Sequence, residues 1–204
     1  MNLGRLKSYQ RSFAKYGATP KALKWQSQKA AEQRYKQIIS EISFNGKSIL
    51  DVGCGFGDLI TWLRKNGATD YTGIDLVPEF IKVARERCPE HHFIVGDYFQ
   101  KPLKDNFDII IACGSLNSNV KDNLVWRQKA IETMFDHAKK AIIFNMAGRP
   151  PPPKTAKGSN VWFADSLEIL KYCLTLSPKV IFRSHYAKRE FTIFCYRANT
   201  IINQ

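Results

Sequence analysis

The chain has 204 residues, of which 44% are hydrophobic, and a formal net charge of +13. This length suits one domain with a buried core and is too short for two ordinary domains. No segment approaches the roughly 20 apolar residues of a membrane-spanning helix, so we expect no membrane insertion. The basic N-terminus has no continuous apolar stretch, which argues against a secretory signal.

The cysteines are scattered and include no closely spaced pair, so they predict neither a zinc site nor a disulfide framework. We therefore expect reduced thiols, no metal and a cytoplasmic location. Residues 1–47 hold 10 basic and 2 acidic residues, and residues 139–204 hold 11 and 3, whereas the middle is slightly acidic. Such basic flanks can steer an anionic partner, or they can simply keep helix faces solvated.

Residues 1–47 read as a basic, mostly helical lead-in, followed by an α/β domain over residues 48–204. Within the lead-in, apolar residues recur at three- and four-residue steps and predict one amphipathic helix over residues 22–42. In chain order, we then expect strands at 48–52, 71–75, 92–95, 107–112, 141–145, 179–183 and 190–197, with helices at 58–66, 78–88, 122–137 and 164–176.

Alternating strands and helices predict a doubly wound, mostly parallel sheet that binds ligands at the carboxyl ends of its strands. The last two strands are separated only by residues 184–189. This connection is too short for a helical crossover, so these strands should form an antiparallel hairpin. The fold class expected is therefore α/β, with a seven-stranded sheet and an antiparallel last strand.

The sharpest motif is a glycine-rich bend after the first strand, containing Gly53, Gly55 and Gly57. Glycines let a backbone turn tightly and approach a ligand closely. A diphosphate-binding loop would need a further glycine where Asp58 stands. A carboxylate there would repel a diphosphate, whereas Asp51 and Asp58 together would favour a cationic ligand.

Two further acids end the next strands. Asp75 ends the second strand, 22 residues after Gly53, where a carboxylate can bind both hydroxyls of a ribose. Asp97 ends the third strand, where the base of a bound nucleoside would lie. The alternatives to ligand binding are purely structural: a tight turn for the glycines, a helix-capping role for Asp75 and a loop role for Asp97. Asp51 could contact a ligand amine or only hold the loop.

With these residues, the chain resembles the class I S-adenosylmethionine-dependent methyltransferases over residues 48–197. That family has a Rossmann-like fold, and its glycine motif corresponds to residues 51–57. Its ribose acid corresponds to Asp75 and its adenine-contacting acid to Asp97. The lead-in, with Trp25-Gln26 and Gln33-Arg34-Tyr35, is similar to that of uncharacterised bacterial members. The resemblance implies S-adenosylmethionine as cofactor, S-adenosylhomocysteine as product, and a cofactor site made of Asp51, Gly53, Cys54, Gly55, Gly57, Asp75, Leu76, Asp97, Tyr98, Cys113, Gly114 and Ser115.

Methyl transfer from a sulfonium needs alignment and exclusion of water more than a specific catalytic group. His185 and Tyr186 lie in the hairpin turn, at the correct edge for a base or an acceptor-orienting pair, although a surface histidine is the bland alternative. Asn117 and Asn145 lie at the same edge, where asparagine often caps a turn. The proline-rich loop at residues 149–154 either walls the acceptor site or is a rigid connector.

Four functions remain in competition. The first is methyl transfer to a small, anionic metabolite, and the second is RNA methylation with the basic flanks holding phosphates. The third is a non-catalytic module that binds cofactor or a partner. A nicotinamide dehydrogenase is disfavoured by Asp58 and the terminal hairpin. Methylation of amino groups on adenine, cytosine or glutamine is also disfavoured, because the sequence after the fourth strand begins Cys113-Gly114-Ser115 and lacks that subgroup's Asn/Asp-Pro-Pro-Tyr motif.

Overall fold

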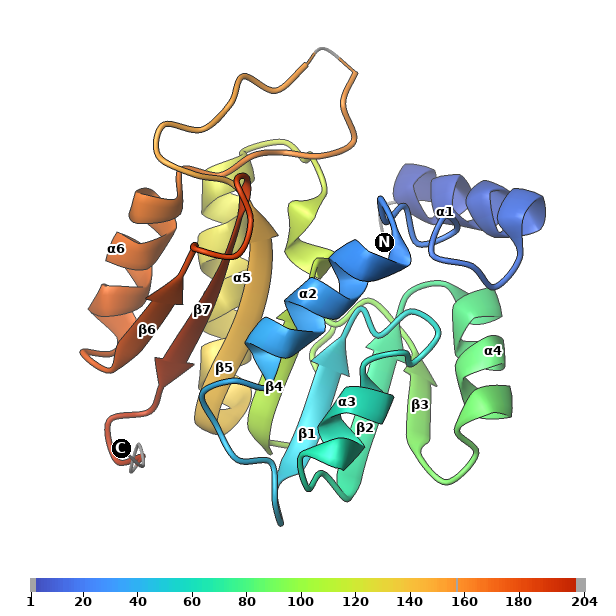
Figure 1. Cartoon of the computed structure of the whole chain (residues 1–204), viewed down its shortest axis with the longest axis horizontal. Helices are drawn as coiled ribbons and strands as arrows, with labels where there is room; N and C mark the ends of the chain where they lie inside the picture. Colours follow the sequence, from blue (N-terminus) through green and yellow to red (C-terminus); the bar gives the residue numbers. More distant parts are fainter. Residues whose placement is uncertain (1–2, 157, 201–204) are drawn as a thin grey trace.

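Seven strands form one sheet in the order β3-β2-β1-β4-β5-β7-β6 (Figure 1). The computed structural model describes residues 3–156 and 158–200. The strands are β1 Ser48–Val52, β2 Asp70–Asp75, β3 His92–Val95, β4 Phe107–Cys113, β5 Ala138–Ala147, β6 Val180–Arg183 and β7 Glu190–Tyr196. The helices are α1 Leu3–Tyr16, α2 Gln28–Ile38, α3 Ile60–Lys65, α4 Pro78–Arg87, α5 Asn123–His137 and α6 Ser166–Leu176, with a 3-10 turn, η1, at Ser115–Asn117.

The direction of the strands confirms the expected fold class. Strands β1 to β5 pair in parallel, as their buried, apolar sequences require. Strand β7 lies between β5 and β6 and is antiparallel to both. The terminal hairpin is therefore present, and its second strand inserts into the sheet beside β5.

Two hydrophobic layers cover the sheet because successive side chains of a strand point to opposite faces. In β5, Ile142 and Phe144 join the core beneath α5 and α6. Ala141 and Ile143 join the opposite core, which contains residues of α2, α3 and α4. Figure 1 shows these helices on the two sides of the sheet. The sheet is thus buried on both faces and leaves its strand ends free to form a site.

The prediction of one helix over residues 22–42 is wrong. Helix α2 covers only Gln28–Ile38, and a turn with Lys24 at a φ of 60° precedes it. The Ser27 hydroxyl accepts a 3.1 Å hydrogen bond from the Ala30 amide, which caps the helix at its first turn. The apolar periodicity of the sequence runs through Ser27, but the helical backbone begins only after it.

The lead-in also contains a helix that the sequence pattern did not predict, α1. Its Tyr9 and Phe13 rings pack against Phe80, and Phe13 also contacts Phe56. Helix α2 packs on β4, β5 and β7 (Figure 1). The division of the chain at residue 47 stays a prediction, but both lead-in helices contribute to the walls described below.

The remaining predicted strands and helices are confirmed to within a few residues. Strand β5 is longer than its apolar run suggested, because it pairs with β7 along Ala141–Ala147. All five cysteine thiols are free. None of the described helices is both long enough and apolar enough to cross a bilayer.

Candidate functional site

A cavity of about 890 Å³, counted with its open mouth, lies at the carboxyl ends of β1, β2 and β4. Every residue of the expected cofactor site lines it except Gly57. Gly57 has a φ of +77°, and a Cβ there would lie 3.3 Å from the Phe93 ring. The glycine thus serves the packing of the bend against its neighbours, and the other predicted residues come together as expected.

The glycine bend is held tightly against its surroundings. Gly53 and Cys54 both donate backbone hydrogen bonds to the carbonyl of Ile74, at 2.7 and 3.2 Å. A Cβ on Gly53 would lie only 2.5 Å from the Cβ of Ser115, and the residue has a φ of +78°. Only glycine fits both the conformation and the space, so η1 can pack directly over the bend.

Asp51 is buried beneath the cavity. Its Oδ2 accepts a 2.8 Å hydrogen bond from the Tyr71 hydroxyl. Its Oδ1 is buried and has no partner among the described residues. Burial raises the pKa of Asp51 to about 7, against the lowering effect of the Tyr71 hydrogen bond, and the charge of Asp75 raises it further. A cationic group in the cavity would favour the ionised form.

Asp75 both lines the cavity and holds the surrounding backbone. Its two carboxylate oxygens accept hydrogen bonds from the amides of Gly55, at 3.0 Å, and Val77, at 2.9 Å. Burial raises its pKa to about 6, although these backbone bonds act in the opposite direction. The helix-capping alternative is not realised, because Val77 is the N-cap of α4 and the helix has no side-chain cap; Asp75 instead holds the turn before the helix.

Two more buried polar atoms of the cavity residues lack a partner. The Tyr98 hydroxyl and the Ser115 hydroxyl make no hydrogen bond within the described chain, as with Asp51 Oδ1. An unsatisfied buried polar group costs about 1–3 kcal/mol. All three atoms belong to residues that line the cavity, where a polar ligand would satisfy those that face it.

The expected attraction of Asp58 for a cationic ligand is wrong. Asp58 does not line the cavity, and its Oδ1 pairs with Nη1 of Arg87 at 2.9 Å. Burial raises the pKa of this carboxyl and Arg87 lowers it. The bend turns Asp58 toward α4, so Asp51 and Asp75 are the acids that remain beneath the cavity.

A second cavity, of about 1370 Å³ with its open mouth, adjoins the first. The two share the wall residues Arg5, Tyr9, Leu23, Trp25, Gly114 and Ser118. The rest of its lining comes from the lead-in, η1, residues 160–163 and the start of β7. The proline-rich residues 149–154 line neither cavity, which favours the alternative of a rigid connector over that of a wall. Later residues of the same loop, Asn160, Val161 and Phe163, line the second cavity.

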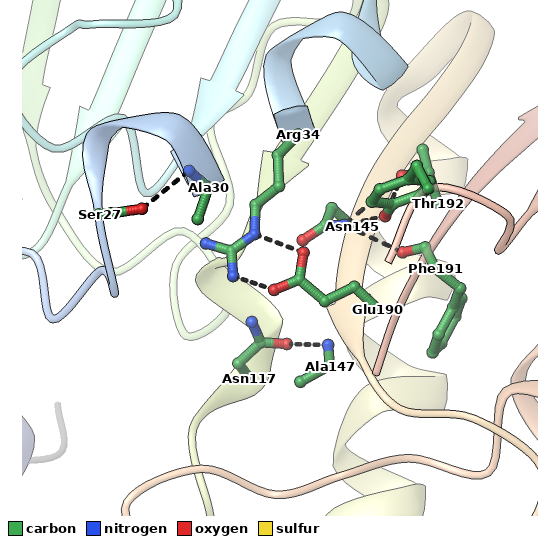
Figure 2. A network of polar contacts seen from close by, with 10 residues as sticks. Ser27, Ala30, Arg34, Asn117, Asn145, Ala147, Glu190, Phe191 and Thr192 are labelled. Atoms are coloured by element: carbon green, nitrogen blue, oxygen red, sulfur yellow. Dashed lines mark hydrogen bonds and ion pairs between the residues drawn. The ribbon is translucent and has the colours of Figure 1, made fainter. Parts of the chain in front are cut away.

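An ion pair joins the lead-in to the sheet beside this second cavity (Figure 2). Arg34 of α2 donates from Nε to Glu190 Oε2 at 2.8 Å and from Nη2 to Oε1. Its guanidinium also lies 4.5 Å from the centre of the Trp25 ring. Burial lowers the pKa of Arg34, but the hydrogen bond and charge of Glu190 outweigh it and raise the pKa overall. Arg34 therefore stays charged.

With this geometry in view, the comparisons with known proteins can be stated. A family model described as a methyltransferase domain matches residues 49–141, which include the glycine bend, Asp75 and Asp97. The sheet, with β7 antiparallel beside β5, completes the pattern. Over residues 49–141 the chain is therefore similar to the methyltransferase-domain family, and its sheet has the Rossmann-like fold of class I S-adenosylmethionine-dependent methyltransferases.

Curated methyltransferases align with only part of this chain. It is 52% identical over 96 residues to a ubiquinone biosynthesis O-methyltransferase of Xylella fastidiosa (strain M23), covering 44% of this chain and 38% of the relative. It is 41% identical over 63 residues to a malonyl-[acyl-carrier protein] O-methyltransferase of Serratia marcescens, covering 31% of this chain and 24% of the relative. The chain thus spans well under two thirds of these relatives.

Solved structures share the fold of this chain over most of its length. Magnesium protoporphyrin IX methyltransferase from Synechocystis PCC 6803, with bound S-adenosylhomocysteine, has a TM-score of 0.63 and 18% identity, covering 84% of this chain and 83% of that one. The N-methyltransferase NodS from Bradyrhizobium japonicum WM9, also with S-adenosylhomocysteine, has a TM-score of 0.65 and 16% identity, covering 95% and 98%. At these identities the likeness concerns the fold.

The two predicted catalytic residues, His185 and Tyr186, lie outside both cavities. His185 is exposed. The Tyr186 hydroxyl lies 2.9 Å from Thr192 Oγ1 and accepts from Asn145 Nδ2 at 2.5 Å, and burial raises the pKa of Tyr186. Their catalytic role stays a prediction. No cluster of possible metal ligands occurs among the described residues.

The two asparagines at this edge both support the architecture of the family fold (Figure 2). Asn117 Oδ1 accepts from the Ala147 amide at 2.8 Å, and Asn145 Nδ2 donates to the carbonyl of Phe191 at 3.1 Å. Sequence reasoning missed Arg34 and Glu190 as site residues. The available signal was that Arg34 interrupts the buried face of α2, where apolar residues precede and follow it.

Proposed function

We propose that this chain transfers a methyl group from S-adenosylmethionine to a small anionic acceptor. When bound, that cofactor supplies a sulfonium with an electrophilic methyl group. The observation that carries the proposal is the set of unpartnered buried atoms, Asp51 Oδ1, Tyr98 OH and Ser115 Oγ, around one cavity. The second cavity, which would hold the acceptor, shares wall residues with this first cavity.

The residues of the first cavity suit the parts of the cofactor. Asp51 offers a carboxylate oxygen to the amine of the methionine moiety, and burial makes this interaction strong. Asp75 would receive the ribose hydroxyls through the free lone pairs of its carboxylate. Asp97 and Tyr98 lie beyond β3, where the adenine would contact them. Gly53 allows the backbone to approach the ligand without a Cβ.

The second cavity favours an anionic acceptor. Its lining includes Arg5, Lys24, Arg34 and Arg189, with Glu190 as the sole acid among the described lining residues. Arg34 is paired with Glu190, so the remaining cations leave a positive excess. Such a field raises the local concentration of anions and orients them in the cavity.

The walls of the cavity favour a small acceptor over a polymer. The loop after β5 folds back onto η1, with the Asn119 amide 2.8 Å from the Asn160 carbonyl and the Trp162 amide 2.9 Å from the Asn117 carbonyl. Helix α1 contributes Arg5 and Tyr9 on another side. These elements form walls around a cavity and give no open track for a phosphate backbone.

Two experiments test the proposal. Calorimetry with S-adenosylmethionine, S-adenosylhomocysteine and NAD should show binding of the first two only. Methyl-labelled S-adenosylmethionine is then incubated with cell extract and the chain, and the extract is separated into small-molecule, RNA and protein fractions. We expect label in anionic small molecules. Label confined to RNA would contradict the acceptor class, and NAD binding would contradict the cofactor.

A further inference from the structure

We infer that Glu190 is a catalytic residue that contacts the acceptor and accepts a proton from the group being methylated, a hydroxyl or an amine. The inference rests on the proposed function and names the chemical class of its acceptor: an anion that also bears a hydrogen-bond donor. Neither His185 nor Tyr186 lines the cavities, so the position beside the acceptor belongs to another side chain.

The pairing of the strands places Glu190 at the ligand-binding edge of the sheet. Asn145 of β5 lies opposite Cys113 of β4 on one side and Thr192 of β7 on the other. Glu190 lies farther along the same ladder, opposite Ala147 at the carboxyl end of β5. Because Cys113 lines the first cavity, Glu190 begins its strand next to the place where the two cavities meet.

The carboxylate of Glu190 is held in a fixed orientation. Arg34 engages both oxygens, and the side chains of Arg34 and Glu190 are only 11% and 18% exposed. Arg34 in turn stacks on Trp25, which lines both cavities. Each carboxylate oxygen has a second lone pair, so Glu190 can still accept a hydrogen bond from the acceptor.

A carboxylate beside an anion-binding cavity selects among anions. Arg5, Lys24 and Arg189 attract the acceptor's negative group, whereas Glu190 repels it. The favourable orientation therefore directs the negative group away from Glu190 and brings an O–H or N–H donor toward it. An acceptor without such a donor would face the carboxylate without gaining a hydrogen bond from it, and would therefore bind less favourably.

The proton and charge balance of the step closes without a further reactant. The acceptor's oxygen or nitrogen forms a bond to the methyl carbon, and the bond from that carbon to sulfur breaks with its electron pair on sulfur. The acceptor's proton passes to a Glu190 oxygen. The positive charge of the sulfonium and the negative charge of the carboxylate are both neutralised, and the proton then leaves to solvent.

The test compares Glu190→Gln with the wild type in methyl-label transfer to the small-molecule fraction of cell extract. General base catalysis typically contributes 10²–10⁴-fold, so we expect the variant's rate to fall about 100-fold or more. Its S-adenosylhomocysteine affinity, measured by calorimetry, should stay within about twofold, because Glu190 does not line the first cavity. Glu190→Asp, which keeps a carboxylate on a shorter side chain, should transfer label at an intermediate rate.

The matched control is Glu41→Gln. Glu41 pairs with Arg183 of β6 and so forms a second ion pair between the lead-in and the end of the chain, but it lines neither of the two adjoining cavities. This variant should keep the wild-type rate. A transfer rate of Glu190→Gln within threefold of the wild-type rate, or an equal loss of rate in Glu41→Gln, would overturn the inference about Glu190. Neither result would contradict the proposed function. A wild-type chain that binds S-adenosylhomocysteine and labels nothing would instead contradict the proposed function.

Discussion

The Tyr71 hydroxyl donates a 2.8 Å hydrogen bond to one carboxylate oxygen of Asp51, and the other oxygen has no partner among the described residues. Tyr71 comes from β2 and Asp51 from β1, so the two strands together orient the carboxylate beneath the cavity. The unpartnered oxygen, Oδ1, is the one that a cationic group would satisfy. Because that oxygen is buried without a partner, Asp51 lowers the stability of the ligand-free protein.

The first prediction concerns pH. Burial raises the pKa of folded Asp51 to about 7, from 3.8, so the folded state holds a proton that the unfolded state releases. This carboxyl's contribution to stability is therefore present at low pH and is lost as pH rises from about 4 to about 7. Relative to Asp51→Asn, the wild type should lose on the order of 2–4 kcal/mol over that interval. Urea unfolding at several pH values measures the difference, and parallel curves would contradict it.

The second prediction concerns Asp75. Asp75→Ala should weaken S-adenosylhomocysteine binding about 100-fold or more, because each hydrogen bond to a carboxylate contributes about 1.5–3 kcal/mol. The substitution also releases the amides of Gly55 and Val77 from their acceptor. Asp58→Asn is the control, since Asp58 pairs with Arg87 outside the cavity. Calorimetry should show nearly wild-type affinity for the control. Equal affinities for all three proteins would remove Asp75 from the site.

The third prediction compares two glycines that share a left-handed backbone. Gly53 and Gly46 have φ values of +78° and +62°, so alanine at either position should cost about 1–2 kcal/mol. A Cβ on Gly46 meets nothing within 4 Å, whereas one on Gly53 lies 2.5 Å from Ser115 Cβ. Gly53→Ala should displace η1 and weaken S-adenosylhomocysteine binding at least tenfold, and Gly46→Ala should affect stability alone. Unfolding curves and calorimetry separate the two effects.

The fourth prediction concerns Arg127, which is fully buried and pairs with no carboxylate among the described residues. Its guanidinium lies between the rings of Trp126 and Trp162, 4.9 and 4.7 Å from their centres, and donates to the carbonyls of Leu116 and Ser118. It thus holds η1 and the loop after β5 in place. Arg127→Met should cost about 2 kcal/mol or more, because it leaves buried carbonyls unpaired.

Hydrogen exchange tests where Arg127 acts. Arg127→Met should raise exchange at residues 115–119 and 159–163, which form the wall of the second cavity. Arg197→Met is the matched control, since Arg197 stacks on Phe135 and donates to the Ala138 carbonyl at the other end of β5. That variant should leave exchange in the two loops unchanged. Unchanged exchange in both proteins would show that the loops hold their positions without Arg127.

The sequence by itself determined the sheet and the residues that meet at the first cavity. Parallel strands end at a common edge, so the glycine bend after β1 and Asp75 after β2 had to meet there once the strands were recognised. The short connection before β7 likewise required an antiparallel hairpin. These features depend on local pattern and chain length, which a single sequence displays.

Only the tertiary structure decided the acceptor side. Arg34 and Glu190 are 156 positions apart, and no local pattern joins them. Asp58 follows the glycine bend directly, yet its side chain turns to Arg87 because α4 packs beside it. The break between α1 and α2 depends on the Ser27 cap and on packing of Tyr9 and Phe13, not on periodicity. Side-chain direction and long-range pairing follow from packing, and packing exists only once the chain has folded.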